Sequence, residues 1–455
     1  SMAHQHLSIL LIIFLILTQT SRSEYTIGAN YGTLANNLPP PTQVATFLKQ
    51  QTIITKIKLF DSNPAVITAF ANTNISVTVS VSNEDIPQLA KLSESTRWVN
   101  SHITPFYPQT LIDRIAVGNE ILATANKNLI AHLLPAMKSL NSALKLTGLS
   151  HIQVCSPHSL GILSVSGPPS LGRFRRGYDR VIFAPLLQYH RDTKTPFMIN
   201  PYPYFGFSPD TLDYALFKPN SGVFDNVTGK TYTNMFDAQL DAVYSAMERL
   251  GYGDVDIVVA ETGWPSVGDA DQPFVNLKNA FSYNANLVKH VNSGKGTPLM
   301  PNRTFETYIF SLFNENLKPG LTAERNFGLF QADFTPVYDI GVMRDSQATG
   351  PSPSTTPTAP SPADTPLKMW CVPKTEANGD ALQANIDYVC RLGIDCSPIQ
   401  DGGACFQPDT VRSHASYAMN AYYQYYGHDN SNCDFTGTGL VTNFDPSYDV
   451  CKYVS

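Results

Sequence analysis

Charged residues are scarce in this chain of 455 residues, at 15% of the total, and the formal net charge is −6. Basic residues crowd together in one place, a Gly- and Pro-rich stretch with Arg173, Arg175 and Arg176. Such a cluster is more often a solvated loop than a phosphate site. The sequence therefore predicts no nucleic-acid partner.

Long hydrophobic runs are also missing beyond the N-terminus. The apolar run Leu7–Leu17, broken by Ser8, is too short to span a bilayer but fits a secretory signal. The last residues, 449–455, are polar, whereas a lipid-anchor signal needs a hydrophobic tail. We therefore expect a signal peptide over residues 1–23, no transmembrane or lipid anchor, and secretion to the extracellular space or cell wall, with the vacuole as an alternative.

Cysteine is nearly absent from most of the chain. Cys155 stands alone, while the other six of the seven cysteines lie between Cys371 and Cys451. Six cysteines in one short segment favour a disulfide framework in an oxidising compartment. A zinc site is the alternative, but no C-x-x-C pair is present and only His414 and His428 lie nearby. We expect disulfides, no metal, and a buried free thiol at Cys155.

Nucleotide-binding motifs are missing as well, because the chain has neither a G-x-G-x-x-G motif nor a P-loop. We expect no cofactor and a monomer. Three N-glycosylation sequons are present, and they can be glycosylated only if the chain is secreted. They begin at Asn74, Asn226 and Asn302.

One low-complexity segment divides the chain. Residues 346–366 consist almost entirely of Pro, Ser, Thr, Ala and Gly, with Asp364 as the one charged residue. Such a composition cannot pack a core and is typical of an extended linker. We expect a large domain over 24–345, a linker over 346–366 and a C-terminal module over 367–455.

In the large domain, apolar β-rich segments alternate with helix-like stretches. Eight such units favour an α/β fold of the (β/α)8 barrel type over a doubly wound sheet. The expected strands are Thr26–Gly32, Ile57–Asp61, Ile75–Val81, Arg114–Glu120, Ile152–His158, Phe197–Pro203, Asp256–Gly263 and Ile309–Glu315. The expected helices include Pro41–Gln50, Pro64–Ala71, Asn128–Leu144, Met235–Leu250 and Phe274–Asn292.

Several of these strands close on polar residues. In a barrel of this type, the carboxyl ends of the strands carry the active site. Glu120 and Glu261 each follow an unbroken apolar run, and a pair of carboxyls can hydrolyse a glycosidic bond. The alternative is that each glutamate merely ends a strand in solvent. The polar strand ends are Asn30-Tyr31-Gly32, Asp61, Asn119-Glu120, Asn200-Pro201-Tyr202, Glu261-Thr262-Gly263-Trp264 and Asn314-Glu315.

Three motifs in the large domain resemble a known family. The segments Ile27–Gly32, Ile115–Glu120 and Ala260–Ser266 resemble glycoside hydrolase family 17, the plant endo-β-1,3-glucanases. The resemblance implies that Glu120 is the general acid/base and that Glu261 is the nucleophile. It also implies a retaining reaction, which needs carboxyls about 5 Å apart.

The resemblance gives the polar neighbours expected roles in binding substrate. Asn119 would bind the sugar 2-hydroxyl, and the Tyr202 hydroxyl would help to keep Glu261 ionised. Glu315 and Lys318 would form a pair in the cleft that tunes Glu120 and contacts sugar hydroxyls. A simple surface ion pair is the alternative for these two residues.

Four aromatic residues near the strand ends could stack on sugar faces or belong to the core. These are Tyr31, Tyr204, Phe205 and Trp264.

The C-terminal module resembles carbohydrate-binding module family 43. The resemblance lies in Trp370–Val372, Asp395–Ile399 and His414–Gln424. It implies one set of disulfides among the many that six cysteines allow, and it implies binding of β-1,3-glucan through some of the module's tyrosines. The implied disulfides are Cys371–Cys433, Cys390–Cys396 and Cys405–Cys451. The candidate tyrosines, some of which belong to the core, are Tyr417, Tyr422, Tyr423, Tyr425 and Tyr426.

Together these features predict a secreted, retaining endo-hydrolase of β-1,3-glucan that holds its polymer through the module. Three alternatives stay open: a hydrolase of mixed-linkage 1,3;1,4-β-glucan, a transglycosylase, and a wall-binding protein without catalysis. The presence of Glu120, Glu261, Asn119 and Trp264 argues against the last alternative.

Overall fold

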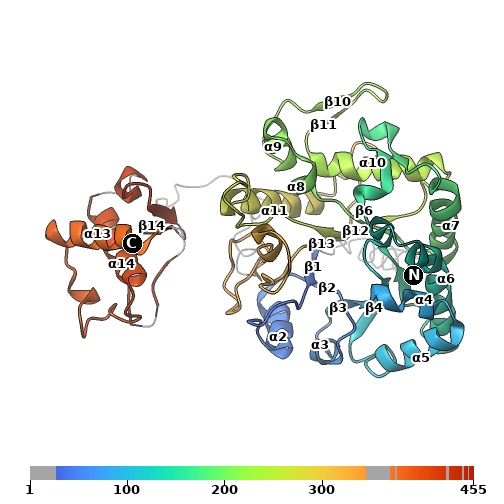
Figure 1. Ribbon diagram of the computed structural model, residues 1–455, viewed down its shortest axis with the longest axis horizontal. Helices are drawn as coiled ribbons and strands as arrows, with labels where there is room; N and C mark the ends of the chain where they lie inside the picture. Colours follow the sequence, from blue (N-terminus) through green and yellow to red (C-terminus); the bar gives the residue numbers. More distant parts are fainter. Residues whose placement is uncertain are drawn as a thin grey trace, which may run out of the picture. The chain divides into compact units, whose positions relative to one another are not determined.

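The computed structural model describes residues 27–344 and residues 369–454, the latter with gaps at 375–376, 427–429, 443–444 and 449. These residues form two compact units, one on each side of positions 352–353 (Figure 1). The expected signal peptide and the expected linker lie outside the described residues.

The larger unit is built on a parallel sheet with the strand order β5-β4-β3-β2-β1-β13-β12-β9-β6. Only Ser156 separates β5 from β6, and β5 pairs with β4 while β6 pairs with β9. The two short strands therefore act as one kinked strand that joins both ends of the sheet. The strands are β1 (Ile27–Tyr31), β2 (Lys56–Leu59), β3 (Ser76–Val81), β4 (Leu111–Val117), β5 (Gln153–Cys155), β6 (Pro157–Ser159), β9 (Phe197–Asn200), β12 (Ile257–Thr262) and β13 (Thr307–Ile309).

Counted this way, the ring has eight strand positions, and the predicted (β/α)8 fold is confirmed. Helices surround the strands (Figure 1). They are α2 (Pro41–Gln51), α3 (Pro64–Ala69), α4 (Ile86–Leu89), α5 (Leu92–His102), α6 (Lys127–Leu146), α7 (Ala184–Thr193), α8 (Pro203–Gly206), α9 (Leu212–Ala215), α10 (Met235–Arg249) and α11 (Leu277–Asn292).

The long helices begin where an asparagine caps their first turn. The side chain of Asn126 accepts hydrogen bonds from the backbone at the start of α6, and Asn234 and Asn276 do the same for α10 and α11. Asparagine suits this position because its side-chain oxygen satisfies backbone N–H groups that the helix leaves free. None of the described helices is long and apolar enough to cross a membrane.

Several strands end earlier than the sequence predicts, and β4 and β13 are two examples. β4 ends at Val117, and Gly118 and Glu120 both have left-handed backbone conformations, with φ of 63° and 53°. β13 ends at Ile309, after which Phe310 and Leu312 still donate backbone hydrogen bonds to the neighbouring strands. After β13 the apolar run therefore continues past the regular strand, whereas after β4 the chain turns directly into the segment that carries Glu120.

Two short hairpins project from the barrel. β7 (Leu163–Val165) pairs with β8 (Arg173–Phe174), and β10 (Val223–Asp225) pairs with β11 (Lys230–Tyr232), in both cases antiparallel. The first hairpin follows directly on β6, so it lies at the carboxyl end of the ring.

The smaller unit is mainly helical and is held by disulfides. Helices α13 (Gly379–Arg391) and α14 (Val411–Tyr425) accompany an antiparallel pair, β14 (Trp370–Pro373) and β15 (Gly439–Thr442). Its core consists of two small clusters of buried residues, which would be marginal without staples. The disulfides join Cys371 to Cys433, Cys390 to Cys396 and Cys405 to Cys451, the same pairs that the family resemblance implies.

Cys155 is free and buried on β5, as predicted. Burial raises the pKa of its thiol to about 12. A thiol that stays protonated is a poor nucleophile, so this cysteine acts as a core residue.

Candidate active site

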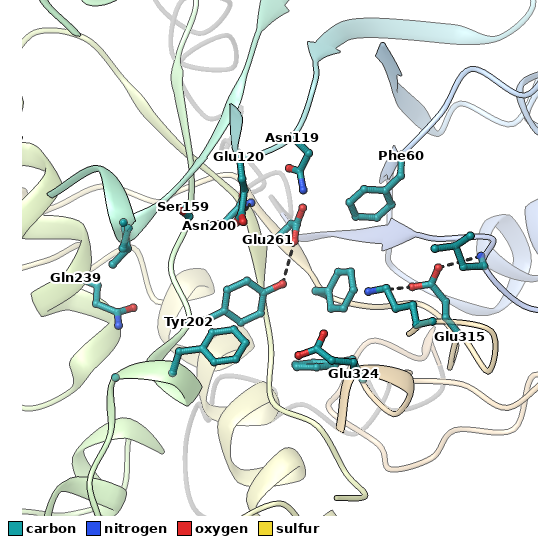
Figure 2. Close-up of a pocket in the computed structure, with 18 of the residues that line it drawn as sticks. Phe60, Asn119, Glu120, Ser159, Asn200, Tyr202, Gln239, Glu261, Glu315 and Glu324 are labelled. Carbon is teal, nitrogen blue, oxygen red and sulfur yellow. Dashed lines mark hydrogen bonds and ion pairs between the residues drawn. The ribbon is translucent and has the colours of Figure 1, made fainter. Parts of the chain in front are cut away.

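A cleft of about 800 Å³ opens at the carboxyl end of the barrel (Figure 2). Residues from several separate strand ends and from the loops above them line it, as expected for this fold. The residues named from the sequence that line the cleft are Asp61, Asn119, Glu120, Asn200, Tyr202, Phe205, Glu261, Glu315 and Lys318.

Glu261 lies near the end of β12 and is buried, with 6% of its surface exposed. The ammonium of Lys58, on β2, lies 3.2 Å from its Oε1, and the hydroxyl of Tyr202 donates to its Oε2 over 3.0 Å. Figure 2 shows the Tyr202 ring pointing at this carboxyl. Burial lowers the pKa of Lys58, while the charge of Glu261 opposes that effect. A cation and a hydroxyl donor together favour the ionised form of a carboxyl.

Glu120 stands on the left-handed turn after β4, where its backbone N–H bonds to the carbonyl of Pro157. Burial raises the pKa of its carboxyl, and the nearby charge of Glu261 raises it further. A hydrogen bond of 2.9 Å from Asn200 Nδ2 to Glu120 Oε1 works in the opposite direction, as does Lys58, but the net direction is upward. Glu120 therefore holds a proton more readily than an ordinary glutamate does.

Asn119 also lines the cleft. Its backbone N–H donates to Asn83 Oδ1 over 2.9 Å, which fixes the turn that carries it. Its own side-chain oxygen is buried and has no hydrogen-bond partner among the described residues. A buried amide oxygen without a partner is costly, so this group is available to a ligand.

Glu315 and Lys318 form an ion pair inside the cleft, not on the outer surface. Glu315 is 4% exposed, and its Oε2 lies 3.5 Å from Lys318 Nζ. Its Oε1 accepts a hydrogen bond of 3.0 Å from the backbone of Leu34. Lys318 also lies over the ring of Phe310, 4.2 Å from its centre. The pair is thus held by the Leu34 backbone at Glu315 and by the Phe310 ring at Lys318.

Tyr31 and Trp264 take no part in lining the cleft, so their predicted stacking on sugar does not fit the structure. Tyr31 is 2% exposed and packs edge-on against Phe70 and Phe313. Trp264 is fully buried, and its Nε1 donates to the carbonyl of Phe274. Both rings are core residues, the alternative that the sequence left open. The aromatic residues that do line the cleft are Phe60, Tyr202, Phe205, Phe310 and Phe327.

Sequence reasoning missed Lys58. It assigned no role to Asn200 or Glu324, although both line the cleft. Lys58 carried a signal, since a lysine in a strand that is buried within a barrel must find an internal partner. Its neighbour Lys56, two residues earlier on the same face of β2, carries the same signal.

A second cluster of charges lies at the opposite end of the barrel, where the strands begin. Arg114 Nη1 lies 2.7 Å from Glu306 Oε1, and Lys56 Nζ lies 3.5 Å from Glu306 Oε2. Tyr308 also donates to Glu306 over 2.9 Å. Burial would raise the pKa of Glu306, but Arg114 and Lys56 outweigh it, and the net direction is downward. This carboxylate is fully paired.

The three sequon asparagines are exposed, at Asn74, Asn226 and Asn302. Asn226 follows β10 within the exposed hairpin. These positions are accessible to a modifying enzyme, and their use stays a prediction.

Comparison with protein families gives two matches. Residues 27–342 match the family described as glycosyl hydrolases family 17, and residues 369–440 match the X8 domain. A wheat protein (Triticum aestivum) named glucan endo-1,3-beta-glucosidase is 54% identical over 437 residues, which is 94% of this chain and 95% of the relative. An olive protein (Olea europaea) named glucan endo-1,3-beta-D-glucosidase is 45% identical over 456 residues, 98% of each chain.

Solved structures agree for the larger unit. CJP38, described as a beta-1,3-glucanase and allergen of Cryptomeria japonica pollen, has a TM-score of 0.65 at 44% identity, covering 69% of this chain and 98% of that one. A structure from a study of two plant beta-glucan endohydrolases with distinct substrate specificities has a TM-score of 0.63 at 37% identity, covering 69% and 99%.

Proposed function

The chain belongs to the glycosyl hydrolases family 17, and on that premise we propose that it is a secreted, retaining endo-hydrolase of β-1,3-glucan. The names of its wheat and olive relatives support the substrate. In this proposal, Glu120 is the general acid/base and Glu261 is the nucleophile.

The observation that carries the assignment is the contrast between the two carboxyls. A glycosidase of this type needs one protonated carboxyl and one ionised carboxyl across the same bond. Glu261 receives an ammonium and a hydroxyl donor, whereas the pKa of Glu120 is raised by burial and by the charge of Glu261. The first environment suits a nucleophile and the second suits an acid.

The reaction then proceeds in two steps. Glu261 attacks the anomeric carbon while Glu120 gives its proton to the departing glycosidic oxygen, which leaves a glycosyl–enzyme ester. Glu120, now ionised, takes a proton from water as that water attacks the same carbon and releases Glu261. The open amide of Asn119 would bind the 2-hydroxyl, where a hydrogen bond strengthens in the transition state.

The test is incubation with a linear β-1,3-glucan, a mixed-linkage glucan and cellulose, followed by reducing ends and by the anomeric configuration of the first product. We expect cleavage of the first substrate with retention. Preference for the mixed-linkage glucan would favour the alternative specificity, and mainly elongated products would favour a transglycosylase. No release from any of the three by folded protein would overturn the proposed function.

We further propose that the C-terminal module binds the same polymer through exposed tyrosine rings. Tyr388, Tyr422, Tyr425 and Tyr426 form a chain of ring contacts, and the centroids of Tyr422 and Tyr426 lie 4.5 Å apart. Tyr425 is 75% exposed, whereas Tyr423 is buried and belongs to the core. Exposed rings of this kind offer flat apolar faces with hydroxyls at their edges, which suits a polysaccharide.

Removal of residues 346–455 tests the module together with the proposed linker. Binding to insoluble β-1,3-glucan should weaken, because tethering raises the local concentration of substrate. Cleavage of short soluble substrates should stay nearly unchanged. An equal loss in both assays would contradict the proposed independence of the two units.

A further inference from the structure

The two flanks of the cleft differ in chemistry. On one side of Glu120 lies Gln239, and on the other side lies Glu315 (Figure 2). Ser159 lines the same cleft. The flank around Gln239 offers neutral polar groups, whereas the opposite flank offers the Glu315–Lys318 ion pair. The catalytic scheme above uses neither Gln239 nor Ser159.

Gln239 is a polar side chain whose bonding is incomplete. It projects from α10 and lines the cleft. Its Oε1 is buried and has no hydrogen-bond partner among the described residues. Since an unpaired buried amide oxygen is costly, a group in the cleft that donates a hydrogen bond would relieve that cost.

Two glycines keep this flank open. A Cβ on Gly206 would come within 3.2 Å of Gln239 Nε2, and a Cβ on Gly161 would come within 3.2 Å of Ser159 Oγ. Both distances are closer than ordinary packing allows without movement. The missing side chains therefore leave the amide and the hydroxyl room to meet a ligand.

We propose that Gln239 and Ser159 form a subsite for one glucosyl unit of the bound chain beside the cleaved bond. The amide accepts a hydrogen bond at Oε1 and donates one from Nε2, which fits the hydroxyls of a sugar because each can donate and accept. This inference rests on the proposed function and adds a residue that sets affinity for longer chains.

The test replaces Gln239 by methionine in the full chain, which keeps the length of the side chain and removes both hydrogen-bonding groups. The matched control is Gln43→Met, because Gln43 is exposed on α2 and outside the cleft. Rates are measured on linear β-1,3-gluco-oligosaccharides from the trisaccharide to the heptasaccharide. We expect Gln239→Met to lower kcat/KM by about threefold to tenfold through KM, only for oligosaccharides long enough to fill the subsite.

An equal loss at every length, or no loss at any length, would overturn the proposal. A second measurement does not depend on turnover: the affinity of the hexasaccharide for Glu261→Gln is compared with its affinity for the double variant that adds Gln239→Met. Thermal unfolding checks that the variants fold. If Gln239→Met does not fold, Gln239→Glu takes its place, because it removes the hydrogen-bond donor at Nε2. If the parent chain binds the hexasaccharide but cleaves nothing, the proposed function fails. The comparison of affinities still shows whether Gln239 contributes to binding.

Discussion

The two ends of the barrel each hold a half-buried glutamate, but they use it in opposite ways. At the end where the strands begin, Glu306 is paired with Arg114 and Lys56, and its pKa is lowered. At the other end, Glu120 has a single amide donor from Asn200, and its pKa is raised. Complete pairing fixes the charge of one carboxyl, while incomplete pairing leaves the other able to exchange a proton.

Strand β2 serves both ends. Lys56 reaches Glu306, and Lys58, two residues later on the same face, reaches Glu261. The first contact belongs to a closed cluster and the second to an open cleft. We therefore expect changes at one end to act on stability and changes at the other to act on turnover.

The largest effect is expected for Glu261→Ala, at the open end. Loss of a nucleophile should lower kcat on the order of 10⁴-fold or more, while binding to insoluble glucan persists through the module. Reducing-end assays and a pull-down with insoluble glucan measure the two properties. Glu248→Ala, on the exposed end of α10, is the control. A variant that keeps most of its activity would show that Glu261 is not the nucleophile.

The next effect is expected at the closed end. Glu306→Gln leaves Arg114 buried without its counter-charge, which should lower the free energy of unfolding by about 3 kcal/mol with kcat nearly unchanged. Urea unfolding followed by tryptophan fluorescence measures the first quantity. Asp256→Asn, which breaks the more exposed pair with Arg303, should have little effect. A large fall in kcat with normal stability would erase the contrast between the two ends.

A smaller effect is expected for Lys58→Met, which removes the ammonium beside Glu261. We expect kcat/KM to fall roughly a hundredfold, as for other preorganised donors in an active site. Lys58→Arg keeps the charge and should recover part of the loss. If methionine and arginine behave alike, the charge of Lys58 has no part in turnover.

The smallest expected effect concerns pH. The acid must be protonated in the free enzyme, so kcat/KM falls as the pH rises through the pKa of Glu120. The Asn200 amide stabilises the ionised form of Glu120 and therefore lowers its pKa. Asn200→Ala should raise that pKa and move the alkaline limb of the kcat/KM profile to higher pH. A limb that moves to lower pH, or does not move, contradicts this assignment of Glu120.

The sequence predicted which polar residues after the strands lie in the cleft better than it predicted the side chains inside the ring. Glu120 and Glu261 were identified because each ends an apolar run, and a parallel barrel gathers such ends on one face. Lys58 was missed because a lysine within a strand is usually read as facing solvent. In a closed ring that same alternation points it into the interior, next to Glu261.

Aromatic residues after the strands resisted prediction for a related reason. Trp264 lies three residues after Glu261 and is fully buried, whereas Phe205 lies three residues after Tyr202 and is exposed in the cleft. Spacing along the chain does not fix which way a ring turns after the strand ends, because the loops above decide it. The bounds of β4 and β13 were also wrong, because backbone hydrogen bonds to the neighbouring strands continue beyond the last regular residue of each strand.

The spacing of the two lysines on β2 also has a consequence for how this gene can change. A strand that slips by one residue turns every side chain to the opposite face. A single-codon insertion or deletion that shifts β2 would therefore withdraw Lys56 and Lys58 together, and it would cost both the fold and the chemistry in one step. A substitution on this strand can affect one end of the barrel alone, whereas an insertion or deletion that shifts the strand affects both ends.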